Sequence, residues 1–247
     1  MKVDNRLKSD DLAQTLSAFT NKELAPLYKL LSEPVSSMFA YKDKVKAAHP
    51  NHAAYADLIA KELCLFGGNT FVNMGRGGGP AYREVVADVC SSLKVKTTGV
   101  MSVPMMEQAL LAKLFDALPT EERDVILTEA AERFGYKPDS TSNAGVAAMI
   151  AAQAGGRAAG FLFYRTGLQL VNMASRVVVG RGLSFAGNAA FTRVLGVAMG
   201  PPGWILSGVW ALKDIASPAL RVTTPAVLIV AGTRQAKLWK SMAEMTA

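Results

Sequence analysis

Apolar residues recur every three or four positions along most of the chain, and the strict alternation that is typical of strands is nearly absent. This spacing predicts an amphipathic helix over residues 9–19 and a second one from residue 21 to the break at Pro34. Asp10-Asp11 and Asn21 are expected to cap these helices, because their side chains accept hydrogen bonds from the free N–H groups of a first turn.

The same pattern continues beyond residue 50. It predicts a helix over 55–66 that is closed by Gly67-Gly68, and another that begins at Pro80 and carries apolar residues through Leu93. Two further helices are expected from Ser102 to residue 118 and from Thr120 to residue 135. We therefore predict an all-α fold.

The composition changes at residues 137–143, which are polar and rich in helix breakers. From Ala144 onward the chain is rich in Ala, Gly and Val, and Val194 to Leu212 is a stretch of 19 residues without a charge. That length approaches the roughly 20 residues that cross a bilayer, but Pro201-Pro202-Gly203 interrupts it and predicts a helical hairpin. A last apolar run, 222–233, leads to a basic end. We predict a soluble helical bundle over 1–140, followed by a glycine-rich, apolar helical region with a hairpin over 141–247.

The net charge of +7 is distributed very unevenly. Residues 141–247 contain ten basic and two acidic residues, whereas residues 1–140 contain 17 basic and 18 acidic ones. Cations among apolar residues favour an anionic membrane surface, while nucleic acid is disfavoured because no recognition module is present. The candidate membrane or partner contacts are the arginines and tryptophans of this half: Arg157, Arg165, Arg176, Arg181, Arg193, Trp204, Trp210 and Arg221.

Two alternatives for these features stay open. The arginines would equally suit the solvated face of ordinary helices, or long side chains that reach up to lipid headgroups. Glycines at four-residue spacing, Gly156/Gly160 and Gly196/Gly200, indicate close helix packing either in a membrane or in a water-soluble bundle.

One loop has the composition of an anion-binding site. Arg76, Gly77, Gly78 and Gly79 precede Pro80 at a predicted helix start, where free N–H groups can bind phosphate. No Gly-Lys-Ser/Thr follows, so this is not a nucleotide-binding P-loop, and a structural turn is the favoured interpretation.

Residues typical of catalysis or metal binding are sparse. His49 and His52 are the two histidines, and neither has a cysteine or acidic partner at ligand spacing. Cys64 and Cys90 lack C-x-x-C spacing and are expected to be buried thiols in a reducing compartment. The sequence therefore predicts a protein that is not an enzyme and has no cofactor or metal.

Two blocks of sequence resemble the bacterial YaaW family. The first runs from Phe66-Gly67-Gly68-Asn69 through Tyr82-Arg83-Glu84 to Leu93-Lys94-Val95, and the second is Leu220-Arg221-Val222-Thr223-Thr224-Pro225-Ala226-Val227. The resemblance implies a distant similarity to ubiquinol–cytochrome c chaperone domains, and with it helices and protein binding near a membrane. It transfers no catalytic residues.

Two functional hypotheses follow. The first is a membrane-associated protein that inserts or forms pores through its C-terminal half; the second is a helical chaperone or adaptor that binds a hydrophobic partner. The polar N-terminus has no apolar signal segment, which predicts a cytoplasmic protein that is peripheral to or inserted in the inner membrane. Self-association into a homo-oligomer stays open.

Overall fold

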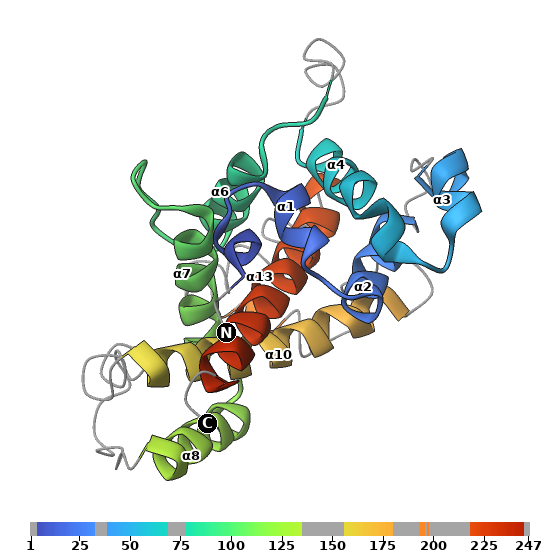
Figure 1. Ribbon diagram of the computed structural model, residues 1–247. Helices are drawn as coiled ribbons and strands as arrows, with labels where there is room; N and C mark the ends of the chain where they lie inside the picture. Colours follow the sequence, from blue (N-terminus) through green and yellow to red (C-terminus); the bar gives the residue numbers. More distant parts are fainter. Residues whose placement is uncertain are drawn as a thin grey trace.

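The computed structural model describes residues 4–32, 39–68, 78–134, 156–179, 193–195, 197 and 218–244. Within these ranges the regular structure consists of α-helices and short 3₁₀ helices, without a strand. The predicted all-α fold is confirmed for this part of the chain (Figure 1).

Two of the helices start where local capping rules place them. The Asp11 carboxylate accepts the N–H groups of Ala13 and Gln14 at 2.7 and 3.2 Å, and the Ser102 hydroxyl accepts the N–H of Met105 at 3.4 Å. The elements from the N-terminus are η1 (Asn5–Lys8), α1 (Leu12–Ser17), α2 (Asn21–Ser32), η2 (Phe39–Tyr41), α3 (Asp43–Ala48), η3 (His52–Tyr55), α4 (Ala56–Phe66), α6 (Tyr82–Ser92), α7 (Val103–Asp116) and α8 (Thr120–Phe134).

The predicted cap at Asn21 is wrong by one residue. Thr20 and Glu23 form a reciprocal capping box, in which the Thr20 N–H donates to the Glu23 carboxylate at 2.7 Å and the Glu23 N–H donates to the Thr20 hydroxyl at 3.3 Å. The Asn21 side chain instead binds the 50–53 segment, where its amide donates to the Pro50 carbonyl at 3.1 Å. Asn21 therefore joins two elements that are distant in sequence.

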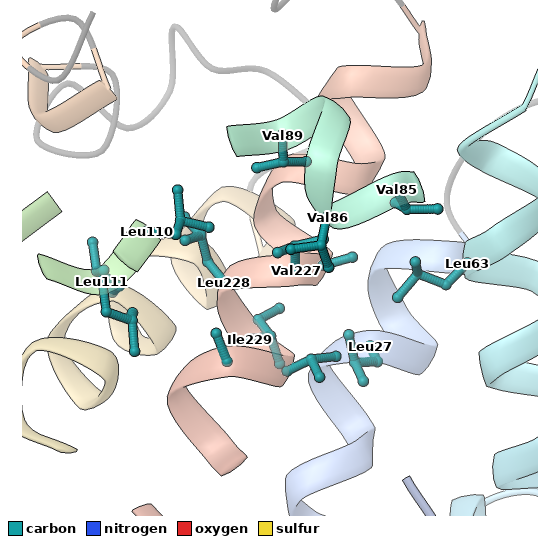
Figure 2. Packing of buried hydrophobic residues seen from close by; sticks show 14 of the residues in the cluster. Leu27, Leu63, Val85, Val86, Val89, Leu110, Leu111, Val227, Leu228 and Ile229 are labelled. Atoms are coloured by element: carbon teal, nitrogen blue, oxygen red, sulfur yellow. The ribbon is translucent and has the colours of Figure 1, made fainter. Parts of the chain in front are cut away.

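Helix α13 (Pro218–Glu244) runs through the centre of the molecule, with α2, α4, α6, α7 and α10 (Gly156–Val179) packed around it (Figure 1). Its apolar run is buried without interruption from Val222 to Val230. A helix that is apolar on all sides must be enclosed by other apolar groups. Figure 2 shows Val227, Leu228 and Ile229 of α13 in a cluster with side chains of α2, α4, α6 and α7.

The predicted boundary at 137–143 and most of the predicted hairpin, 194–212, lie outside the described residues. Within the described ones, helices from both sides of that boundary share one core: Leu27 and Leu110 belong to the same cluster as Leu170 and Val227. The division into two domains and the arrangement of a bundle followed by a hairpin therefore stay predictions, whereas α13 packs as part of the N-terminal bundle.

Helices α10 and α13 cross with their backbones in direct contact. A Cβ atom added to Gly167 would lie 2.6 Å from the Cα of Gly232, and one added to Gly232 would lie 2.6 Å from the Gly167 carbonyl oxygen. Of the glycines that the sequence named for close helix packing, Gly160 also lies against α13, where an added Cβ atom would be 3.1 Å from the Met242 side chain. Gly196 and Gly200 lie outside the described residues. The crossing pair escaped notice because its members are 65 positions apart in the chain.

Among the described helices, none combines the length and the apolar character that a membrane crossing requires.

Candidate binding cleft

A fully buried charge network joins α13 to three other elements. The Arg234 Nε atom lies 2.7 Å from Glu107 Oε2, and its Nη1 donates to the backbone carbonyls of Leu7 and Ser9, both at 2.9 Å. The Tyr82 hydroxyl donates to Glu107 Oε1 at 2.9 Å. Arg234 and Glu107 have no solvent exposure, so this network connects η1, α6, α7 and α13 inside the core.

The network perturbs the protonation of its members and of the neighbouring Cys90 thiol. Burial raises the pKa of Glu107 above its usual 4.5, although the Arg234 guanidinium and the Tyr82 hydroxyl act to lower it. Burial, together with the adjacent Glu107, also raises the pKa of Tyr82 well above 10 and that of the Cys90 thiol to about 12. Since substrate has no access to these groups, we assign the network to structure.

The candidate anion loop is described only at its end. Arg76 and Gly77 lie outside the described residues, a Cβ atom on Gly78 would meet nothing within 4 Å, and one on Gly79 would lie 2.4 Å from the Cys64 carbonyl carbon. Gly79 thus allows the backbone to pack directly on α4. The close packing of Gly79 on α4 agrees with the interpretation of this loop as a structural turn.

The predicted contact arginines have different environments. Arg165 forms an ion pair with Glu129, Nε to Oε2 at 2.6 Å and Nη2 to Oε1 at 2.7 Å, whereas Arg193 is exposed. The side chains of Arg157, Arg176 and Arg221 and the whole of Arg181, Trp204 and Trp210 lie outside the described residues. The structure therefore places one of these eight residues, Arg165, in a defined site.

That site is a cleft of about 490 Å³ between α8 and α10. Two stripes at helical spacing line it, one from each helix: Glu129, Glu132 and Arg133 from α8, and Phe161, Tyr164 and Arg165 from α10. Positions i, i+3 and i+4 lie on one face of a helix, so each stripe presents three charged or ring-bearing side chains to the cleft.

An aromatic cluster backs the cleft. The ring of Trp239 in α13 stacks on Tyr164 with centroids 6.3 Å apart and planes at 12°, and it meets Phe161 edge-on at 5.4 Å. Phe134 completes the cluster at 6.1 Å from Trp239. The Arg133 guanidinium lies 5.4 Å from the Trp239 ring and 5.8 Å from the Phe161 ring, within the range of cation–π attraction.

Sequence reasoning found Arg165 and missed Arg133, Phe161, Tyr164 and Trp239. The two stripes can be seen in the sequence, but nothing local shows that they face each other. Their connection passes through residues 135–155, and the Trp239 that joins them comes from a third helix.

The histidines belong to another aromatic cluster, at α2 and η3. His52 stacks on Tyr28 with centroids 4.7 Å apart, and its Nδ1 lies 2.5 Å from the Tyr55 hydroxyl oxygen. Burial, and secondarily His49, lowers the pKa of His52. Among the described residues, no three His, Cys, Asp or Glu side chains gather in a way that would hold a metal ion.

The described residues form a helical bundle that packs around one central helix, α13. The cleft between α8 and α10 is lined by charged and aromatic side chains. A UPF0174 protein of Helicobacter pylori strain J99 is 33% identical over 92% of both chains, and one of strain 26695 is 31% identical over 74% of this chain and 90% of its own. The UPF0174 protein YaaW of Escherichia coli K12 is 30% identical over 94% of this chain and 96% of its own. The chain belongs to the UPF0174 family, which includes YaaW.

This result confirms the resemblance to YaaW that the two sequence blocks indicated. No family model matches the chain. No solved structure matches it either. The distant similarity to ubiquinol–cytochrome c chaperone domains stays a prediction.

Proposed function

We propose that this protein acts by binding and not by catalysis, as a helical adaptor that holds a segment of another protein in the cleft between α8 and α10. The observation that carries the proposal is an exposed guanidinium, Arg133, which lies over the buried rings of Trp239 and Phe161 beside the partly exposed Tyr164. Tyrosine, tryptophan and arginine are the residues most enriched at the energetic centres of protein interfaces.

The geometry of the cleft suits a peptide segment. Its rings are held by one another, so few rotamers remain to be frozen when a ligand binds. The Arg165–Glu129 ion pair, with side chains 27% and 38% exposed, fixes one wall. A volume of about 490 Å³ accommodates a few side chains of a partner.

Photocrosslinking in the cells that make this protein tests the proposal. A photoreactive phenylalanine analogue replaces Glu132 at the cleft, and in a matched control it replaces Val125, which is 54% exposed on the same helix but does not line the cleft. We expect a discrete protein adduct from position 132 that position 125 does not give.

The captured protein is then purified and titrated with the full chain. Tyr164→Ala is expected to weaken its binding about 30-fold, the effect of losing one central aromatic contact, while Tyr164→Phe retains it. Equal adducts at both positions, or an affinity that Tyr164→Ala leaves unchanged in a folded variant, would remove the proposal.

Attachment to an anionic membrane surface is the second candidate, and the charge distribution favours it. Residues 141–247 retain their excess of basic residues, and two of them, Arg193 and Lys240, are exposed. We restrict this candidate to the surface, at the cytoplasmic side of the inner membrane, because the apolar part of α13 is enclosed by other helices.

Flotation with vesicles tests membrane attachment. The full chain should float with phosphatidylglycerol-containing vesicles at low salt and remain in the dense fraction with pure phosphatidylcholine. Failure to float with either vesicle at low salt eliminates membrane attachment and leaves the adaptor proposal unaffected.

A further inference from the structure

Four charged side chains line the cleft. Two of them form an ion pair with each other, and the other two form no ion pair with a described residue. Arg165 and Glu129 neutralise each other through two short contacts, 2.6 and 2.7 Å. Glu132 and Arg133 also line the cleft, and both are exposed. In the described part of the chain, no carboxylate lies within ion-pairing distance of Arg133, so its charge is available to a ligand.

Arg133 is better prepared for binding than Glu132. The Arg133 guanidinium lies over the rings of Trp239 and Phe161, and these contacts restrict its position. The N–H donors of a guanidinium point outward in its plane, so the rings do not block them. A planar fork of N–H donors matches a carboxylate, which it can bind through two parallel hydrogen bonds. Glu132 has no ring or ion-pair contact among the described residues, and a solvated flexible carboxylate contributes little to binding.

Resting on the proposed function of the cleft, we infer that its occupant is an acidic peptide segment that places a carboxylate on Arg133 and an adjacent aromatic or apolar side chain against Tyr164, the partly exposed ring of the cleft. Arg133 is the selective residue, because it is the cleft cation that has no carboxylate partner among the described residues. Tyr164 supplies apolar contact, the buried rings of Phe161 and Trp239 hold the guanidinium, and the guanidinium supplies the preference for negative charge.

Arg133 also lies in the last turn of α8, where a cation stabilises the carbonyl end of the helix. If that were its only role, the cleft would bind ring-bearing ligands without regard to their charge. The two explanations therefore predict different results for ligands that share a ring and differ in charge.

Three probes with one aromatic body make this test: phenylpropionate, phenylpropionamide and phenylpropylammonium. Each is titrated into the full chain at low salt while the amide resonances of α8 and α10 and the indole N–H of Trp239 are followed by NMR. We expect phenylpropionate to bind about fivefold tighter than the neutral amide, as one exposed charge-assisted contact would give, and phenylpropylammonium to bind most weakly.

Arg133→Gln should make the acid and the amide bind equally, without weakening the amide. The matched control is Arg123→Gln, which removes the same charge from the same helix at a residue that does not line the cleft, and it should keep the preference. Circular dichroism confirms the fold of both variants.

The inference is overturned if phenylpropylammonium binds tightest, if Arg133→Gln keeps the preference for the acid, or if no probe moves the cleft resonances. Equal binding of all three probes overturns the selectivity but leaves a binding cleft, and thus the proposed function, in place. The crosslinking result at position 132 stands independently of these titrations, so the two failures are distinguishable.

Discussion

Replacing Arg234 by methionine tests the buried network most directly. Arg234→Met removes the guanidinium while keeping much of the side-chain volume, and it leaves Glu107 fully buried without its cation. The Leu7 and Ser9 carbonyls lose their donor at the same time. Breaking a buried pair in this way destabilises a protein by about 3–5 kcal/mol, because the remaining charge is uncompensated.

For a chain of 247 residues, that loss corresponds to a fall of roughly 6–20 °C in Tm. The assay is urea unfolding followed by circular dichroism, with Lys240→Met as the control. Lys240 lies exposed on the same helix, so its replacement should change the free energy of unfolding by less than about 0.5 kcal/mol.

The pH dependence gives a second readout. A carboxyl whose folded pKa is raised contributes most to stability below its ordinary pKa, 4.5 for Glu107, and the contribution is lost as the pH rises through the folded pKa. Removing Arg234 takes away a charge that lowers the pKa of Glu107. As the pH rises above 4.5, the stability of Arg234→Met should therefore continue to fall over a wider pH range than that of the native chain, because Glu107 stays protonated to a higher pH in the folded variant.

A double-mutant cycle separates the ion pair from the packing. Glu107→Met/Arg234→Met should be more stable, by at least about 2 kcal/mol, than the sum of the two single effects predicts, since it leaves no unpaired charge. Single variants that each lose less than about 1 kcal/mol, or effects that simply add, would refute the assignment of this pair as a mutually dependent buried network.

Three further substitutions test the packing and the caps, each by urea unfolding. Gly232→Ala should destabilise the chain by about 1–3 kcal/mol because its Cβ atom would meet the Gly167 backbone at 2.6 Å, whereas Gly99→Ala, with nothing within 4 Å, should be close to neutral. Tyr82→Phe removes a hydroxyl that donates to a buried carboxylate at 2.9 Å and should lose about 1–3 kcal/mol. Thr20→Ala opens the capping box of α2 and should lose about 1 kcal/mol, and no change would show that the box is dispensable.

Local rules predicted the local structure well. Asp11 and Ser102 start their helices as expected, and Gly67 follows α4 as its C-cap. The helix start at Asn21 was displaced by one residue because Thr20 also has a capping side chain, and the partner Glu23 favours Thr20. The start and end of a helix depend on residues within four positions of each other, so they can be predicted from the sequence.

The placement of α13 could not be predicted in the same way. An uninterrupted apolar run satisfies either a lipid environment or the centre of a bundle, and the periodicity does not distinguish them. The contacts of Arg234 show that α13 lies at the centre of the bundle, because this residue is fully buried and binds the carbonyl of Leu7, which is 227 positions away. The cleft was missed for the same reason, because its two stripes meet only in the folded chain.

The charge asymmetry of the sequence takes on a different meaning in the fold. Among the described residues, three cations of the C-terminal half pair with carboxylates of the first 140 residues, namely Arg165 with Glu129, Arg234 with Glu107 and Lys237 with Glu23. The shortage of acidic residues in 141–247 is thus partly met by the other half of the chain. Counting charges within each half overstates the positive charge that is left for a membrane.

These ion pairs between the two halves of the chain determine which experiment on membrane attachment is informative. A fragment of residues 141–247 would lack all three carboxylates and the helices that enclose the apolar surface of α13. It would expose cations and apolar side chains that the full chain buries or pairs, and both attract the fragment to anionic vesicles. Flotation of the fragment would therefore report the loss of its intramolecular partners, and only flotation of the full chain reports a membrane-binding surface of the folded protein.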